Sequence, residues 1–198
     1  MIYFLRHGET EWNKEHRYQG AMNSPLTDLG KNQIELVCEA FERETLPSKP
    51  LKVYVSPLGR AIETAKILGK HIEIEIINDD RLREVSLGSW DGLTKAEIER
   101  LFPHALDDSK PYNWYFSSPD GEKLVSAKER VISWLNDVSG QHVCAVAHGL
   151  IGRILMGVYL GLDDNEFLKL AIAQDAYYKI HDGKVYAIGR NVLNSDEA

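Results

Sequence analysis

Cysteine is scarce in this chain of 198 residues, which contains only Cys38 and Cys144. Neither residue belongs to a CxxC pair or to a spacing typical of metal ligands, so the sequence shows no disulfide framework and no zinc motif. We interpret both as small buried hydrophobic residues, which agrees with a reducing, cytoplasmic environment.

Long apolar runs and an excess of basic residues are missing as well. No apolar stretch approaches the roughly 18 residues that a transmembrane helix needs, and no basic segment leads into a secretory core, so we expect a cytoplasmic protein. The 23 lysine and arginine residues are outnumbered by 30 aspartate and glutamate residues. Binding to nucleic acid or to an anionic membrane requires a basic stripe and is therefore not expected. A small anionic substrate is compatible with this charge, because a few arginines in a cleft suffice to bind it.

What the sequence does contain is an alternation of helical and strand-like patterns. Four segments carry apolar residues at i, i+3, i+4 and i+7, the spacing of one helix face. These segments start at Ile34, Leu58, Val131 and Ile151. Short apolar runs typical of strands occur at residues 2–5, 53–56, 72–77 and 143–147.

Two local motifs refine this pattern. Thr94 and Glu97 have the spacing of a capping box that starts a further short helix. Asp182-Gly183 lies between the strand-like runs 177–181 and 184–188 and is a strong hairpin signal. We therefore predict an α/β fold, a three-layer α/β/α sandwich whose mostly parallel central sheet has an antiparallel edge strand.

A chain of this length is most simply one domain spanning residues 1–198. Residues 102–121 interrupt the alternation with three prolines and a group of aromatic residues. We interpret this stretch as a loop-rich insert, because long loops in compact domains often act as lids or binding loops. Its aromatic residues could equally fill a gap in the core, and both interpretations stay open. The aromatic residues are Tyr112, Trp114, Tyr115 and Phe116.

Three of the predicted strands are followed by polar residues that could act in binding or catalysis. The first delivers Arg6 and His7, the second delivers Ser56 as a helix cap with Arg60 in the first turn, and the run 143–147 delivers His148. Open α/β folds place their sites at the carboxyl ends of parallel strands. A guanidinium offers a planar fork of donors to phosphate oxygens, so these residues suit a phosphoryl group.

Glu84 adds a carboxylate in a short loop after the run 72–77. Taken singly, each of these residues has a structural interpretation. Glu84 could pair with Arg81 or Arg83, Arg60 could lie in solvent, and a histidine at a strand end is more often a hydrogen-bonded structural group. The combination of these residues favours a functional site.

The remaining histidines show no comparable context, and we expect surface or structural roles for them. They are His16, His71, His104, His142 and His181. A metal site would need clustered ligands, such as two histidines at i and i+4 with a carboxylate. No such cluster occurs in the sequence, so we expect neither a metal ion nor another cofactor.

Several stretches of the chain carry motifs that occur in one known family, in the same order. They are Leu5-Arg6-His7-Gly8-Glu9-Thr10-Glu11-Trp12-Asn13, Arg17-Tyr18-Gln19-Gly20, Ser24-Pro25-Leu26-Thr27-Asp28-Leu29-Gly30, Ser56-Pro57-Leu58-Gly59-Arg60-Ala61 with Thr64-Ala65, Leu82-Arg83-Glu84, Gly88-Ser89-Trp90-Asp91-Gly92 and Ala147-His148-Gly149. With these motifs the chain resembles the histidine phosphatase superfamily, which includes the cofactor-dependent phosphoglycerate mutases.

This resemblance implies a role for each candidate residue. His7 would be the nucleophile that forms a phosphohistidine, since a neutral imidazole has a lone pair that can attack phosphorus. Glu84 would protonate the leaving alkoxide and then activate the hydrolytic water. The phosphoryl oxygens would be bound by Arg6, Asn13, Arg60, His148 and, more weakly, Gln19.

Within the family, the sequence favours the phosphatase branch. Phosphoglycerate mutases hold the substrate carboxylate with extra basic residues, whereas Lys110 is the only lysine or arginine in residues 102–121. We therefore expect a metal-independent phosphomonoesterase for a small phosphorylated metabolite, with few basic groups outside the phosphate pocket. Three alternatives stay open: a phosphoglycerate mutase, a cobamide-pathway nucleotide (alpha-ribazole phosphate) phosphatase, and a non-catalytic module that binds phosphorylated ligands.

Overall fold

Strands and helices alternate along most of the chain. A computed structural model describes residues 1–45, 50–107, 109–110 and 112–189. In chain order its elements are β1 (Ile2–Arg6), α1 (Glu11–Lys14), α2 (Asp28–Thr45), β2 (Leu51–Val55), α3 (Gly59–Leu68), β3 (Ile74–Asn78), the 3₁₀ helices η1 (Asp80–Leu82) and η2 (Gly88–Trp90), α4 (Lys95–Leu101), the 3₁₀ helix η3 (Trp114–Ser117), α5 (Leu124–Asp137), β4 (Val143–Ala147), α6 (Gly149–Leu160), α7 (Asp164–Phe167), β5 (Ala176–His181) and β6 (Lys184–Gly189).

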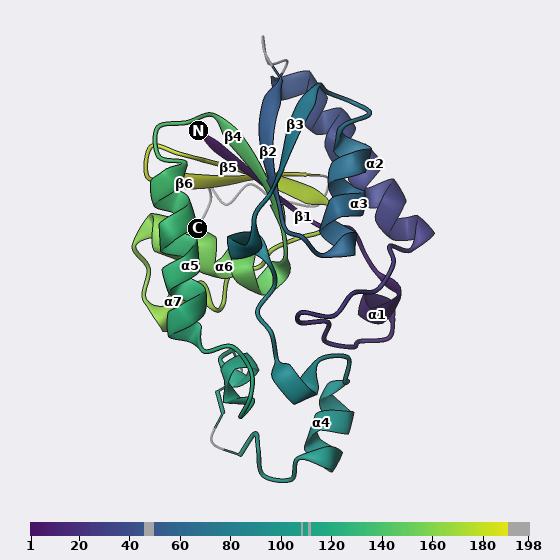
Figure 1. Ribbon diagram of the computed structural model, residues 1–198, viewed down its shortest axis with the longest axis vertical. Coiled ribbons are helices and arrows are strands. Elements are labelled where there is room, and N and C mark those ends of the chain that lie inside the picture. The colour runs from purple at the N-terminus through teal and green to yellow at the C-terminus, as the bar shows by residue number, and fades with distance from the viewer. Residues whose placement is uncertain (46–49, 108, 111, 190–198) are drawn as a thin grey trace.

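Six strands form one sheet in the order β3-β2-β4-β1-β5-β6 (Figure 1). The first four are parallel, and β5 and β6 form an antiparallel hairpin at one edge. β1 lies inside the sheet, where Ile2 pairs with Val143 of β4 on one side and Ile180 of β5 on the other. The prediction of a mostly parallel sheet with an antiparallel edge is confirmed, and that edge comprises two strands.

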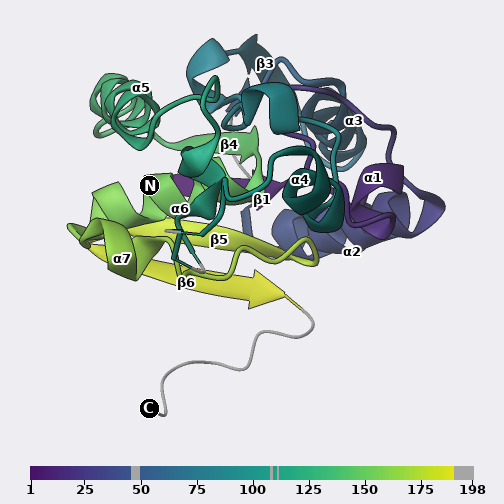
Figure 2. The ribbon, with the colours of Figure 1, turned by 90° about the horizontal axis from the view of Figure 1, so that it is seen from below.

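Helices cover both faces of the sheet (Figures 1 and 2), which confirms the three-layer prediction. Alternate residues of a strand point to opposite faces. Leu5 therefore packs into the core beneath α2 and α3, whereas Phe4 packs into the core beneath α5 and α6. Cys38 and Cys144 are unpaired and buried together in the α2–α3 core, as predicted.

The two local motifs adopt their predicted structures. Thr94 caps α4, accepting from the N–H of Glu97, whose side chain bonds back to the Thr94 backbone. Asp182 and Gly183 both have positive φ, 50° and 73°, as a two-residue turn between twisted strands requires. Hairpin and cap thus follow from local sequence alone.

The segment between β3 and α5 leaves the sheet and carries a small core of its own. That core contains Leu87, Trp90, Ile98 and Trp114, and the two indole rings stack with centroids 6.4 Å apart. Figure 1 shows α4 in this segment, away from the sheet. The predicted insert at 102–121 falls in this segment, with residues 108 and 111 outside the described part. No helix in the described ranges combines the length and the apolarity needed to cross a membrane.

Candidate active site

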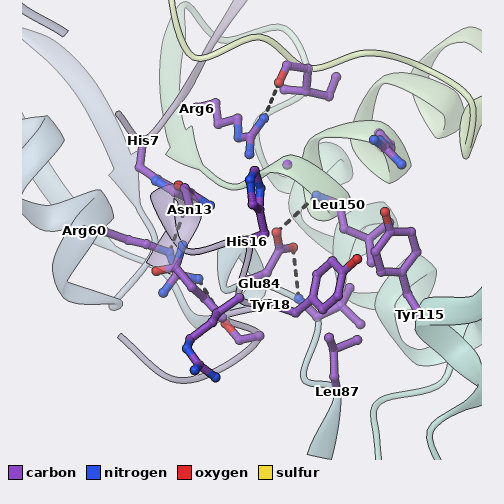
Figure 3. A pocket seen from close by; sticks show the side chains of 17 residues that line it. Arg6, His7, Asn13, His16, Tyr18, Arg60, Glu84, Leu87, Tyr115 and Leu150 are labelled. Carbon is purple, nitrogen blue, oxygen red and sulfur yellow. Dashed lines mark hydrogen bonds between the residues drawn. The ribbon is translucent and has the colours of Figure 1, made fainter. Parts of the chain in front are cut away.

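Three neighbouring strands, β2, β4 and β1, end at the same edge of the sheet, and residues at or shortly after their ends line one pocket, among them His7 and Arg60 (Figure 3). The backbone N–H of His7 donates to the Ala147 carbonyl at 3.1 Å, and that of Ser56 donates to the Val146 carbonyl at 3.0 Å. Both residues thus extend the strand pairing by one step. His7 and His148 follow paired strand ends, and their ring centroids lie 5.1 Å apart.

Arg60 lies between the two imidazoles and is only 1% exposed. Its Nε donates to His7 Nε2 at 3.2 Å and to His148 Nδ1 at 3.1 Å. Its Nη1 and Nη2 donate to the carbonyls of Met22 at 2.5 Å and Gly20 at 2.9 Å. Every nitrogen of the guanidinium is therefore bonded, which fixes a positive charge at the pocket floor.

These contacts determine which nitrogen of each imidazole carries the lone pair. Nδ1 of His7 lies 2.8 Å from the Gly8 carbonyl, which can only accept, so Nδ1 carries the proton and Nε2 the lone pair. Nδ1 of His148 accepts from Arg60, so its proton is on Nε2, which donates to Ser56 Oγ at 2.6 Å. Both lone pairs therefore face Arg60.

Burial and neighbouring cations favour the neutral form of both histidines. Desolvation lowers the pKa of His7 well below its ordinary value of 6.5, and the charges of Arg60 and Arg6 lower it further. The pKa of His148 is lowered in the same way, first by burial and then by Arg60. Burial also lowers the pKa of Arg60 to about 10, so this residue stays charged at neutral pH.

Ser56 does not cap α3, contrary to the prediction. The N-cap is Leu58, without a side-chain hydrogen bond of its own, and Ser56 lies two residues before it. Ser56 Oγ accepts from the Leu58 backbone N–H at 3.3 Å and, at the shorter distance of 2.6 Å, from His148 Nε2. The physical reason is that a buried imidazole N–H needs an acceptor, and Ser56 follows a strand adjacent to the one that ends at His148.

Arg6 occupies the side of the pocket next to α6. Its Nη1 donates to the Ile172 carbonyl at 2.6 Å, and its Nε is buried without a partner. A Cβ on Gly149 would lie 3.3 Å from Arg6 Cζ, so the glycine leaves room for the guanidinium. Arg6 therefore has donors that are not used by the protein.

Glu84 is held by the start of α6. Its carboxylate accepts from the backbone N–H of Leu150 at 3.1 Å (Figure 3) and from that of Ile151 at 3.0 Å. The first N–H groups of a helix have no partner within it and favour a negative charge. Among the described residues Glu84 forms no ion pair with Arg81 or Arg83, and Arg81 pairs with Asp79 and Asp137, so the interpretation of Glu84 as an ion-pair partner is wrong.

The structure places Asn13 and Gln19 on the same pocket. Asn13 Oδ1 accepts from the Thr10 backbone N–H and from Gln174 Nε2, which leaves the amide NH₂ of Asn13 as a donor. Gln19 is 7% exposed, and its Oε1 is buried without a partner. Gln174 also donates to the His7 carbonyl, a contact that no sequence motif indicates because Gln174 lies in the loop before β5.

His16 lines this pocket as well, although the sequence predicts a surface or structural role for it (Figure 3). It follows α1 with a φ of 58°, the left-handed conformation that is uncommon outside glycine. His16 is exposed, as the sequence predicts, but its place beside the pocket could not be inferred from periodicity, because such a turn changes the direction of the side chain.

Aromatic and apolar side chains form one wall of the pocket. It includes Tyr115 from the 102–121 segment, while Trp114 next to it is buried, so the aromatic residues of that segment serve both packing and the pocket. The expectation of few basic groups outside the phosphate pocket is wrong, because Arg17 and Arg153 also line it, with His16. The wall consists of Tyr18, Val85, Leu87, Tyr115, Leu150 and Ile172.

The described residues contain no group of three or more His, Cys, Asp or Glu side chains that could hold a metal ion. Arg6 and Arg60 provide positive charge at the pocket floor, and Glu84 is the single carboxylate among the described lining residues. Such an arrangement can stabilise a phosphoryl group, offer it a nitrogen nucleophile and move a proton at the departing oxygen.

Comparison with known proteins finds one matching family and several similar proteins. The profile of the histidine phosphatase superfamily (branch 1) matches residues 2–185. Phosphoserine phosphatase 1 of Hydrogenobacter thermophilus is 31% identical, covering 91% of this chain and 85% of that protein. The probable phosphoglycerate mutase GpmB of Photorhabdus laumondii is 34% identical, covering 82% and 75%. The structure of Bacillus stearothermophilus YhfR aligns with a TM-score of 0.79 at 28% identity, over 98% of this chain and 97% of that one.

Proposed function

This chain belongs to branch 1 of the histidine phosphatase superfamily and is a phosphomonoesterase, and we propose that it hydrolyses a small phosphorylated metabolite through a phosphohistidine on His7, without a metal ion. One observation carries this proposal. The unprotonated Nε2 of His7 lies 3.2 Å from Nε of Arg60 at the pocket floor. A nitrogen lone pair beside a fixed cation suits attack on a phosphorus whose oxygens the cation neutralises.

The reaction has two steps. In the first, Nε2 of His7 forms a bond to phosphorus as the bond to the ester oxygen breaks, and Glu84 donates a proton to that oxygen. In the second, water attacks the phosphohistidine, Glu84 accepts a proton from the water, and the P–N bond breaks to release phosphate. The N–H groups of Leu150 and Ile151 hold the Glu84 carboxylate in place for both steps.

Arg6, Arg60, His148, Asn13 and Gln19 bind the phosphoryl oxygens in this proposal. Arg6 and Asn13 have donors that the protein leaves unused. The Nε of Arg60 would exchange its bonds to the two imidazoles for a bond to phosphate. His148 has a lone pair on Nδ1 and can donate there only after it takes up a proton, which a bound dianion favours.

The first test is hydrolysis of p-nitrophenyl phosphate in the presence of EDTA. We expect turnover to survive chelation, because arginine side chains supply the positive charge that other phosphatases take from divalent ions. Release of nitrophenol and of inorganic phosphate should be followed together. Loss of activity in EDTA that magnesium or zinc restores would contradict the metal-independent mechanism.

The alternatives differ in their products. Incubation with 3-phosphoglycerate and its bisphosphate activator should release inorganic phosphate in excess of 2-phosphoglycerate, whereas a mutase would yield mainly 2-phosphoglycerate. A cobamide-pathway enzyme would prefer alpha-ribazole phosphate over small phosphomonoesters. A binding module would bind phosphorylated ligands without turnover of any of them.

A further inference from the structure

Arg153 is one of the charged residues that line the pocket. It is the only charged residue of α6 and lies one turn after Gly149 and Leu150, so the helix presents all three on one face. All three line the pocket. Arg153 therefore places a guanidinium beside the apolar part of the pocket wall.

Arg153 and Arg6 are tethered in the same way. Nη1 of Arg153 donates to the Leu168 carbonyl at 3.0 Å, and Nη1 of Arg6 donates to the Ile172 carbonyl at 2.6 Å. The Nε of each is buried and has no hydrogen-bond partner. The two guanidinium groups are close enough for the charge of Arg153 to lower the pKa of Arg6, after the larger effect of burial. One short segment, residues 168–172, thus holds two cations on the same side of the pocket.

The charge of Arg153 is not matched by an ion pair in the described part of the chain. Arg17, which lines the same pocket, is instead bonded to Glu97 at 2.7 Å and to Glu15 at 2.9 Å. Buried donors of a charged group cost free energy until an acceptor binds them. Since Arg6 is assigned to the phosphoryl group, Arg153 is available for a second acidic group of the substrate.

We infer that the leaving group of the substrate carries a carboxylate bound by Arg153, so that the substrate is a phosphomonoester of a small hydroxy acid; this inference rests on the proposed phosphatase function. The fork of one guanidinium matches the two oxygens of a carboxylate. A second phosphate dianion would need a further cation, and Arg17 is already paired with Glu15 and Glu97. The apolar side chains of Leu150 and Ile172 suit a short carbon skeleton. Glu84 is bonded to the first turn of the same helix, so adjacent turns of α6 would serve the ester oxygen and the carboxylate.

The test compares phosphomonoesters that differ in the carboxylate alone. O-phospho-L-serine is paired with O-phosphoethanolamine, and 3-phosphoglycerate with glycerol 3-phosphate, in which a hydroxymethyl group replaces the carboxylate. For the wild-type enzyme we expect kcat/KM to favour the acid of each pair by about 10- to 100-fold, the range for a hydrogen-bonded charge pair.

Substitutions assign this preference to Arg153. Arg153→Met should bring the ratio of kcat/KM within each pair close to one. Arg153→Lys should keep part of the preference, because an ammonium keeps the charge and loses the fork. Arg17→Met is the matched control, and we expect it to keep the wild-type ratio. If Arg153→Met does not fold, the Arg153→Lys variant tests the inference by itself. A ratio of kcat/KM equal to that of the wild type would then show that a residue other than Arg153 binds the carboxylate.

The outcomes separate the inference from the proposed function. Equal kcat/KM within each pair, for a wild-type enzyme that hydrolyses p-nitrophenyl phosphate, would overturn the inference alone. A preference for the acids that persists in Arg153→Met would also overturn it. Failure of the wild-type enzyme to hydrolyse p-nitrophenyl phosphate and all four esters would overturn the proposed function instead.

Discussion

Arg60 and His7 depend on each other at the scale of single residues. Arg60 is buried with its charge, and the lone pairs of His7 and His148 accept from its Nε. In return, the positive charge of Arg60 disfavours the protonated form of His7, so that Nε2, the proposed nucleophile, keeps its lone pair at neutral pH. One side chain therefore affects both the charge at the pocket floor and the protonation of His7.

Replacing Arg60 with methionine should raise the pKa of His7. Burial and Arg60 both lower this pKa, so removal of the cation leaves burial and the more weakly acting Arg6, and the histidine protonates at a higher pH than in the wild type. NMR titration of the His7 Cε1–H signal, assigned with His7→Gln, measures the midpoint. A midpoint that does not move would show that Arg60 does not set the protonation of His7.

Glu84→Gln should separate alkyl from aryl substrates. Glutamine keeps the size of the side chain but cannot protonate an alkoxide, so hydrolysis of alkyl phosphates should fall by about 10²- to 10⁴-fold. Nitrophenolate leaves without that proton, but the second step still needs a base, so phosphoenzyme should accumulate and a burst of nitrophenol should appear in rapid-mixing experiments. His7→Ala is the control that forms no phosphoenzyme. Equal losses on both substrates without a burst would assign Glu84 a structural role.

At the scale of elements, the regular structure and the site differ in how well the sequence predicts them. The apolar quartet that starts at Ile34 lies within α2, because helix periodicity is a local property. Arg6 and His7 could be predicted as site residues because their motif directly follows the strand-like run 2–5. Arg153 was not, since the periodicity of an apolar helix does not tell whether a polar residue faces solvent or a pocket. The bond of Ser56 to His148 was not predictable, because His148 is distant in sequence, whereas its bond to the Leu58 backbone N–H is local.

The packing of α6 against α7 gives a prediction at this scale. Gly157 lies within α6, and a Cβ there would be 2.1 Å from Cβ of Phe167 in α7. Gly157→Ala should therefore destabilise the protein by about 1–3 kcal/mol, although alanine favours helix by about 1 kcal/mol. Gly69→Ala is the matched control, because the atom nearest to the new Cβ would be Cδ1 at the flexible end of Ile74, at 3.1 Å. Urea denaturation compares the two variants, and equal stabilities would refute the close contact.

At the scale of the whole molecule, the buried histidines make stability depend on pH. The folded-state pKa values of His7 and His148 are lowered, so below pH 6.5 the unfolded chain binds protons that the folded chain does not. The free energy of unfolding should thus decrease as pH falls from 7.5 to 5.5, by up to about 1.4 kcal/mol for each histidine. Urea denaturation in phosphate-free buffer measures this decrease. His7→Gln and His148→Gln should each reduce it, and an unchanged pH dependence in both variants would contradict the assignment.

The central position of β1 has a consequence for biosynthesis. Among the described elements β1 is synthesised first, but its neighbours β4 and β5 begin only at Val143 and Ala176. At common translation rates, on the order of 10 s or more passes before β5 emerges. Until β4 emerges, the strand that carries Arg6 has no partner strand, and Arg153 and Gln174 are synthesised later still. The proposed nucleophile is therefore synthesised long before the residues that complete its site, so the site can form only late in the synthesis of these elements.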